Sequence, residues 1–263
     1  MKRAALFFDI DGTLLDNKTW TIPESAIKAL KKARENGHYL FINTGRTFSG
    51  LSAVRKQFEF DGYQCGCGCH LVYQGEVLLE QHVERERGKE ILKKMRECNV
   101  FGAVEALETI YFPTEKTTIP LLEWEKIYYI ENGMGELVDF DNAEFTYDKL
   151  FLFTDEKSDM ETFSRFVCED MEVIDRGNGN YEVAQKAFTK GTACELMRKM
   201  LGLELDQIYV FGDSMNDLEM FRFAKHTIAM GEHAKGLEPY TEFITKNVED
   251  DGIAFAMKYY GLI

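Results

Sequence analysis

Three runs of apolar residues in this chain each end in a short polar cluster, and this pattern constrains the fold more than any other feature. Residues 4–8 lead into Asp9-Ile10-Asp11-Gly12-Thr13, residues 39–42 into Asn43-Thr44-Gly45-Arg46, and residues 208–211 into Gly212-Asp213-Ser214-Met215-Asn216-Asp217. A short continuous apolar run is typical of a strand that is buried on both faces. Parallel strands joined by helices bring such clusters to one edge of the sheet, where ligands bind. The sequence therefore predicts an α/β fold with its functional residues at one sheet edge.

The alternation of strand and helix patterns is interrupted in the middle of the chain. Residues 83–185 mix short strands with helices and include a turn at residues 177–180 that joins two strands. Residues 100–148 combine aromatic runs with polar turns, and their elements are not assigned. We expect a Rossmann-like parallel-sheet core over residues 1–82 and 186–263, with an inserted α+β domain over residues 83–185.

The helix after the first strand carries start and stop signals. Thr21 and Glu24 form a capping-box pattern, Pro23 lies in the first turn, and Gly37 follows the last turn. We therefore expect the Thr21 side chain to cap this helix.

Charge and composition limit the possible partners. The formal net charge is −14, so nucleic acid and anionic membranes are poor partners, although a small anionic substrate fits a locally positive pocket. No segment approaches the roughly 18 apolar residues of a membrane helix, and the N-terminus shows no signal-peptide pattern, so we expect a cytoplasmic protein. The six cysteines are then thiols. Cys65, Cys67 and Cys69 lack the spacing of paired zinc ligands and indicate small buried residues at a strand end.

The polar clusters have the composition of a phosphate site. Four carboxylates at one edge (Asp9, Asp11, Asp213 and Asp217) would repel one another strongly, and a hard divalent cation such as Mg²⁺ resolves this repulsion. The remaining candidates supply positive charge or hydrogen-bond donors to a phosphate, and they are Lys190, Arg46, Thr44, Gly45 and Gly12. Taken alone, Asp217 is equally consistent with a residue that caps a helix, and Arg46 with a residue that forms a structural ion pair.

In these motifs the sequence resembles the haloacid dehalogenase superfamily of phosphohydrolases, in its Cof-type branch with a type IIB α/β cap. The matching segments are Asp9-x-Asp11-Gly12-Thr13-Leu14, Thr44-Gly45-Arg46, Lys190-Gly191 and Gly212-Asp213-x-x-Asn216-Asp217, in the family's order. The resemblance implies that the core is a haloacid dehalogenase core and that the insertion is its cap.

The resemblance also implies a role for each matching residue. Asp9 would be the nucleophile and a Mg²⁺ ligand, and Asp11 would protonate the leaving group, activate water and bind Mg²⁺ through its backbone carbonyl. Asp213 would bind Mg²⁺ through its side chain, and Asp217 would orient the metal's water shell or Lys190. Thr44 and Lys190 would hold the transferring phosphoryl group, and Asn216 would contact the substrate phosphate.

We expect a Mg²⁺-dependent phosphatase that hydrolyses small phosphate monoesters, such as sugar phosphates or related phosphorylated metabolites, through a phospho-aspartate on Asp9. Two alternatives stay open. One is a phosphomutase or phosphotransferase that passes the group to a second hydroxyl, and the other is a non-catalytic sensor of phosphate ligands. The sequence does not identify the physiological ester, the cap residues that select it, or the oligomeric state.

Overall fold

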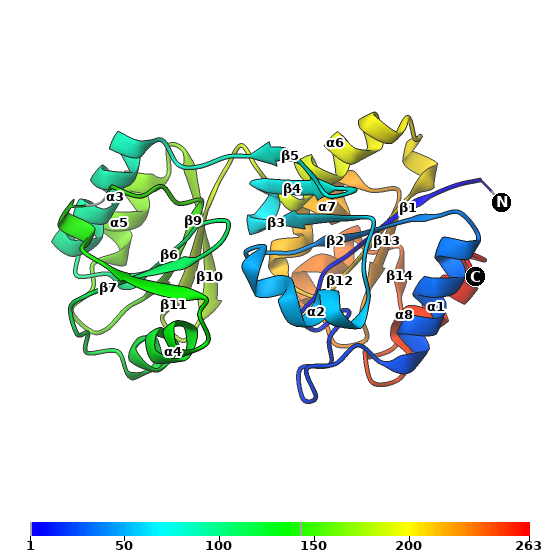
Figure 1. Cartoon of the computed structure of the whole chain (residues 1–263), viewed down its shortest axis with the longest axis horizontal. Coiled ribbons are helices and arrows are strands. Elements are labelled where there is room, and N and C mark those ends of the chain that lie inside the picture. The colour runs from blue at the N-terminus through cyan, green and yellow to red at the C-terminus, as the bar shows by residue number, and fades with distance from the viewer. Residues whose placement is uncertain (1, 143) are drawn as a thin grey trace. The chain divides into compact units, whose positions relative to one another are not determined.

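The structure is a computed structural model that describes residues 2–142 and 144–263. The chain divides into two compact units (Figure 1). The core unit contains Met1–Arg46, Leu51–Leu79 and Thr189–Ile263, and the second unit contains Thr47–Gly50 and Glu80–Phe188. The boundaries at residues 82/83 and 185/186 stay our prediction for the ends of the inserted domain.

The core unit is built on an eight-stranded sheet with the order β14-β13-β12-β1-β2-β3-β4-β5. Each neighbouring pair from β14 to β3 is parallel, and β4 runs antiparallel to β3. This mainly parallel sheet confirms the predicted α/β class. The strands are β1 (Ala5–Phe8), β2 (Tyr39–Asn43), β3 (Gly62–Cys65), β4 (His70–Tyr73), β5 (Glu76–Glu80), β12 (Ile208–Gly212), β13 (His226–Ala229) and β14 (Phe243–Ile244).

Helices of the core unit pack in two pairs. One pair is α1 with α8 and the other is α6 with α7 (Figure 1). Apolar residues of α6 and α7 form one buried cluster with alternate residues of β1, among them Ala5 and Phe7. Because successive strand residues point to opposite faces, this cluster covers one face of the sheet. The helices are α1 (Glu24–Glu35), α2 (Ser52–Gln57), α6 (Lys190–Leu201), α7 (Leu218–Phe223) and α8 (Gly252–Tyr259).

The start of α1 differs from the sequence prediction. Pro23 precedes the helix, and no side chain caps its N-terminus through a hydrogen bond. The Thr21 hydroxyl instead lies 2.8 Å from the Thr19 hydroxyl. The capping-box prediction is therefore wrong, because the preceding loop uses the hydroxyl that the cap needs.

The second unit contains a six-stranded sheet with the order β10-β11-β9-β6-β7-β8. One buried cluster joins residues of α3 and α5 to this sheet, and a smaller cluster joins α4 to it. The unassigned stretch 100–148 contains β6, β7, α4 and β8. The strands and helices are α3 (Arg85–Glu97), β6 (Phe101–Glu105), β7 (Ile110–Pro113), α4 (Pro120–Glu131), β8 (Gly135–Val138), β9 (Lys149–Phe153), α5 (Met160–Val167), β10 (Met171–Gly177) and β11 (Asn180–Gln185).

Cys65, Cys67 and Cys69 are buried around the turn that joins β3 to β4. Among the described residues, the groups of side chains close enough to share a metal ion consist of aspartates and glutamates and include no cysteine. Within the same residues, no helix has both the length and the apolar character needed to cross a membrane.

Candidate functional site

The predicted site residues of the core unit follow three neighbouring strands. Asp9 follows β1, Thr44 follows β2 and Asp213 follows β12, and β1 pairs with both β2 and β12 in parallel register. Their side chains therefore begin at the same edge of the sheet. Lys190 is the first residue of α6, which begins after a capping box formed by Thr189 and Thr192. The sheet and one helix start thus bring all three polar clusters to one place.

The Lys190 ammonium group lies at the centre of this edge. Its Nζ donates to Asp9 Oδ1 at 2.6 Å, to Asp217 Oδ1 at 2.6 Å and to Asn216 Oδ1 at 3.2 Å. An ammonium group has three donors, so each is used. Burial acts to lower the Lys190 pKa, but the charges of Asp217 and Asp9 outweigh burial and raise the pKa. Lys190 therefore stays charged although its side chain is fully buried.

Asp217 uses both of its carboxylate oxygens inside the protein. Oδ1 accepts from Lys190, and Oδ2 accepts from the backbone N–H groups of Asp213 at 2.9 Å and Ser214 at 3.0 Å. The side chain is completely buried. Asp217 therefore ties Lys190 to the loop that carries Asp213.

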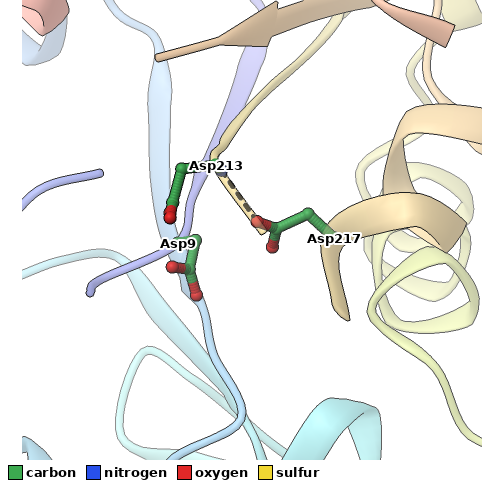
Figure 2. Close-up of side chains that lie close together, drawn as sticks. All are labelled: Asp9, Asp213 and Asp217. Carbon is green, nitrogen blue, oxygen red and sulfur yellow. Dashed lines mark hydrogen bonds between the residues drawn. The ribbon is translucent and has the colours of Figure 1, made fainter. Parts of the chain in front are cut away.

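Asp9, Asp213 and Asp217 form a compact acidic group in which one carboxylate oxygen of each lies within 4.8 Å of the others. Figure 2 shows the Asp213 carboxylate directed toward that of Asp9, with Asp217 bonded to the Asp213 backbone. Burial raises the pKa of Asp9 well above its usual value, although the Lys190 charge opposes this. Burial and the Asp217 charge raise the pKa of Asp213 to about 7. Even with Lys190 present, the ionised form of both groups is therefore disfavoured relative to a free carboxyl group, and a second cation would favour it.

Gly12 and Thr13 shape the space around Asp213. Gly12 has φ +81°, and a Cβ there would lie 2.7 Å from Asp213 Oδ2, so only glycine allows this approach. The Thr13 hydroxyl donates to Asp213 Oδ1 at 2.8 Å. Together they fix the Asp213 carboxylate beside the first loop.

Asp11 is paired with Arg46. The guanidinium Nε donates to Asp11 Oδ2 at 2.8 Å, and a second guanidinium nitrogen donates to Oδ1, so the pair is bidentate. The Arg46 backbone N–H also donates to the buried Thr44 hydroxyl at 3.1 Å. Gly45 lies between them in the same turn. The structure thus places Arg46 on a carboxylate, in the ion pair that the sequence left as an alternative.

Three contacts were not anticipated from the sequence. Thr13, Asn43 and Ser214 were expected only as members of the polar clusters, without individual roles. Asn43 Nδ2 donates to the Lys190 carbonyl at 2.9 Å, and the Ser214 hydroxyl donates to Asn216 Oδ1 at 2.8 Å. These bonds hold Asp213, the start of α6 and Asn216 in place. The polar character of the three residues and their position at or after the end of a strand were the only available signals.

The donor set fits a hard divalent cation. Four carboxylates (Asp9, Asp11, Asp213, Asp217) face two cationic side chains (Lys190, Arg46), which leaves a formal excess of two negative charges. The candidate ligands are all oxygens, which Mg²⁺ prefers. Of the acidic group, Asp217 already has protein donors on both oxygens, whereas Asp9 and Asp213 face each other.

Comparison with known proteins identifies the family. The chain belongs to the haloacid dehalogenase-like hydrolases, which it matches over residues 6–257, and it is a Cof-type phosphohydrolase.

Individual relatives are similar over the whole length. The chain is 24% identical over 270 residues to the putative phosphatase YkrA of Bacillus subtilis (strain 168), with 100% of both chains covered. It is 24% identical over 271 residues to the 5-amino-6-(5-phospho-D-ribitylamino)uracil phosphatase YwtE of the same organism, with 94% of each covered. Among solved structures, BT4131, described as a HAD subclass IIB sugar phosphatase, is 27% identical with a TM-score of 0.84, covering 99% of this chain and 100% of the other. The predicted family, fold class and phosphatase class are confirmed.

Proposed function

We propose that this protein is a Mg²⁺-dependent phosphatase that hydrolyses small phosphate monoesters through a phospho-aspartate on Asp9. The observation that carries the proposal is the buried Lys190 ammonium, held 2.6 Å from both Asp9 and Asp217 beside Asp213. A carboxylate nucleophile next to a fixed cation suits attack on phosphorus, because the approaching ester is itself an anion.

Asp9 and Asp213 would hold Mg²⁺ through their side chains, and Asp11 through its backbone carbonyl. When bound, Mg²⁺ neutralises charge on the transferring phosphoryl group. We assign Asp217 to holding Lys190 and the Asp213 loop, because its oxygens already accept bonds from both.

The chemistry of the residues then proceeds in two displacements. A carboxylate oxygen of Asp9 attacks phosphorus and the bond to the leaving oxygen breaks. Asp11, which must enter this step protonated and with one oxygen released by Arg46, gives the leaving oxygen its proton. Water then attacks the phosphorus of the phospho-aspartate while Asp11 takes the water proton, which releases phosphate and restores Asp9. Thr44, Gly45 and Asn216 would bind the phosphoryl oxygens, and Lys190 would turn toward them the donor that now reaches Asn216 Oδ1 at 3.2 Å.

Arg46 is better placed to position Asp11 than to bind phosphate, since its guanidinium donates hydrogen bonds to both Asp11 oxygens. We expect Arg46→Gln to slow alkyl phosphate esters by roughly tenfold to a hundredfold, because the proton donor loses its orientation. p-Nitrophenyl phosphate should lose much less, since its leaving group needs little protonation. The measurement is kcat and KM for both kinds of ester.

A matched control for this variant is Arg222→Gln, which removes an exposed arginine paired with Glu219 on the same helix. It should leave both esters unaffected. If Arg46→Gln raised KM equally for both esters and left kcat unchanged, the phosphate-contact role expected from the sequence would replace the positioning role.

The natural substrate is proposed only as a class, a small phosphorylated metabolite, and the location is proposed to be the cytoplasm. The net charge of −14 argues against nucleic acid as a partner. Related proteins named as acting on a sugar phosphate and on a phosphoribitylamino-uracil make both kinds of ester sensible first substrates.

The direct test measures inorganic phosphate released from a panel of phosphate monoesters with Mg²⁺ and with EDTA. We expect release only with Mg²⁺, and calorimetry should detect Mg²⁺ binding that Asp213→Asn weakens. Asp206→Asn is a control, because that carboxylate is exposed at the surface, where it lies 3.6 Å from the Lys2 ammonium. Equal turnover in EDTA would refute metal dependence, and transfer to an added alcohol without phosphate release would favour a phosphotransferase.

A further inference from the structure

Trp20 lies on the loop between β1 and α1, and 60% of its surface is exposed. This loop is the blue segment that leaves the sheet edge after β1 in Figure 1. Tryptophan carries a large apolar face, which a folded chain usually covers. The exposed indole of Trp20 therefore offers an uncovered apolar face to a ligand.

The loop holds Trp20 in a conformation that bulky residues rarely adopt. Its φ is +55°, in the left-handed region. The Trp20 N–H donates to the Asp16 carbonyl at 2.8 Å, and Asp16 side-chain oxygens accept from the Lys18 N–H at 2.8 Å and the Thr19 hydroxyl at 3.0 Å. Several bonds thus maintain a backbone that is unfavourable by itself. Such strain is a common mark of a functional position.

Trp20 is connected to the proton donor through one side chain. The Arg46 guanidinium carbon lies 5.9 Å from the centre of the indole ring, and Arg46 Nε donates to Asp11 at 2.8 Å. Asp11 is the group that contacts the leaving oxygen in the proposed reaction. The indole therefore lies on the leaving-group side of the site, one guanidinium away from Asp11.

We propose that Trp20 is a specificity residue, on which a ring in the leaving group of the ester stacks. A heteroaromatic ring offers a flat face and a sugar ring a face of C–H groups, and either packs on the indole, whereas an open-chain polyol has no fixed face. This proposal rests on the proposed phosphatase function and assigns its preferred substrates to ring-bearing phosphate esters. The competing explanation is that Trp20 only covers Arg46 through a cation–π contact.

Kinetics of matched esters separate these explanations. Glucose 6-phosphate and mannose 6-phosphate carry rings, and sorbitol 6-phosphate and mannitol 1-phosphate are their open-chain counterparts, with a primary alkoxide as the leaving group in all four. We expect the wild type to favour the ring esters, and Trp20→Ala to lower kcat/KM for them roughly fivefold to tenfold, mainly through KM. Trp20→Phe should keep most of the preference. Equal losses for ring and open-chain esters, or no preference in the wild type, would overturn the proposal.

A binding measurement makes the result independent of turnover. The chain has two tryptophans, and the second, Trp124, is exposed on α4 in the other unit. In Asp9→Asn/Trp124→Phe protein, fluorescence reports Trp20 alone, and glucose 6-phosphate should change it saturably while sorbitol 6-phosphate should not. In the matched Asp9→Asn/Trp20→Phe protein, the remaining Trp124 signal should not respond.

These readouts distinguish failure of the inference from failure of the function. Mg²⁺-dependent phosphate release without any Trp20 effect would leave the phosphatase intact and remove the stacking role. If no ester is hydrolysed, the proposed function fails, and a saturable Trp20 signal would still support a ring-binding site. Absence of that signal would overturn the site as well.

Discussion

We expect Asp9→Asn to lower the rate of phosphate release by roughly 10⁴-fold or more, because an amide cannot form the phospho-enzyme. The variant should still fold. Asp9 is buried with a raised pKa, so removing its charge removes a desolvation cost. Lys190 keeps its 2.6 Å contact with Asp217. The measurement is single-turnover phosphate release, with thermal unfolding followed in parallel.

Asp206→Asn provides the matched surface control and should retain full activity.

Asp11→Asn tests the second step of the proposed mechanism. If Asp11 activates water in the second step, this variant should accumulate a phosphoryl adduct with p-nitrophenyl phosphate, which acid quenching and intact mass spectrometry detect. An adduct that persists in Asp9→Asn would show that another residue is the nucleophile.

The strands that carry the site could be predicted because each is a short apolar run that ends in a polar cluster, which is typical of buried parallel strands. The apolar run at residues 4–8 corresponds to β1 (Ala5–Phe8), and residues 208–211 correspond to β12 (Ile208–Gly212). Once the strands are parallel and adjacent, the residues that follow them must share an edge. The gathering of Asp9, Thr44 and Asp213 therefore followed from periodicity and topology alone.

The contacts within the site could not be predicted, because side-chain rotamers leave no trace in a sequence pattern. Asp217 could have faced a metal, but its two oxygens bind Lys190 and the loop N–H groups. Arg46 could have reached a phosphate, but it binds Asp11. Each residue type fits both partners, so only geometry decides between them.

The second unit was hard to predict for a different reason. In α4, Lys126 is only 6% exposed whereas Trp124 is 61% exposed, which reverses the usual relation between polarity and burial. The Lys126 ammonium reaches the Glu115 carbonyl at 2.8 Å, a contact between residues that no periodic pattern links. Helical periodicity is therefore weak in this segment, and its boundaries could not be assigned.

Lys190→Met should have the largest effect on stability. It leaves Asp9 and Asp217 buried without their cation, and breaking a buried ion pair from one side costs about 3–5 kcal/mol of unfolding free energy. Because the Lys190 charge lowers the Asp9 pKa, its removal raises that pKa further. An acid with a raised folded-state pKa loses stability as pH rises above its unfolded value, so the deficit should be greater at about pH 8 than at about pH 5.

The measurement is urea unfolding of metal-free protein in EDTA, in a Trp124→Phe background so that Trp20 reports the core unit separately. Lys126→Met is the matched control, because it removes another buried lysine, from the second unit, and should leave the core transition unchanged. Adding Asp217→Asn to Lys190→Met should recover part of the loss, since one buried charge disappears. At urea concentrations below the unfolding transition, the activity of Lys190→Met, with or without Asp217→Asn, should fall roughly 10²- to 10³-fold, because the phosphoryl group loses its fixed cation. A fully stable and active Lys190→Met protein would show that this ammonium neither holds the carboxylates in place nor takes part in the reaction.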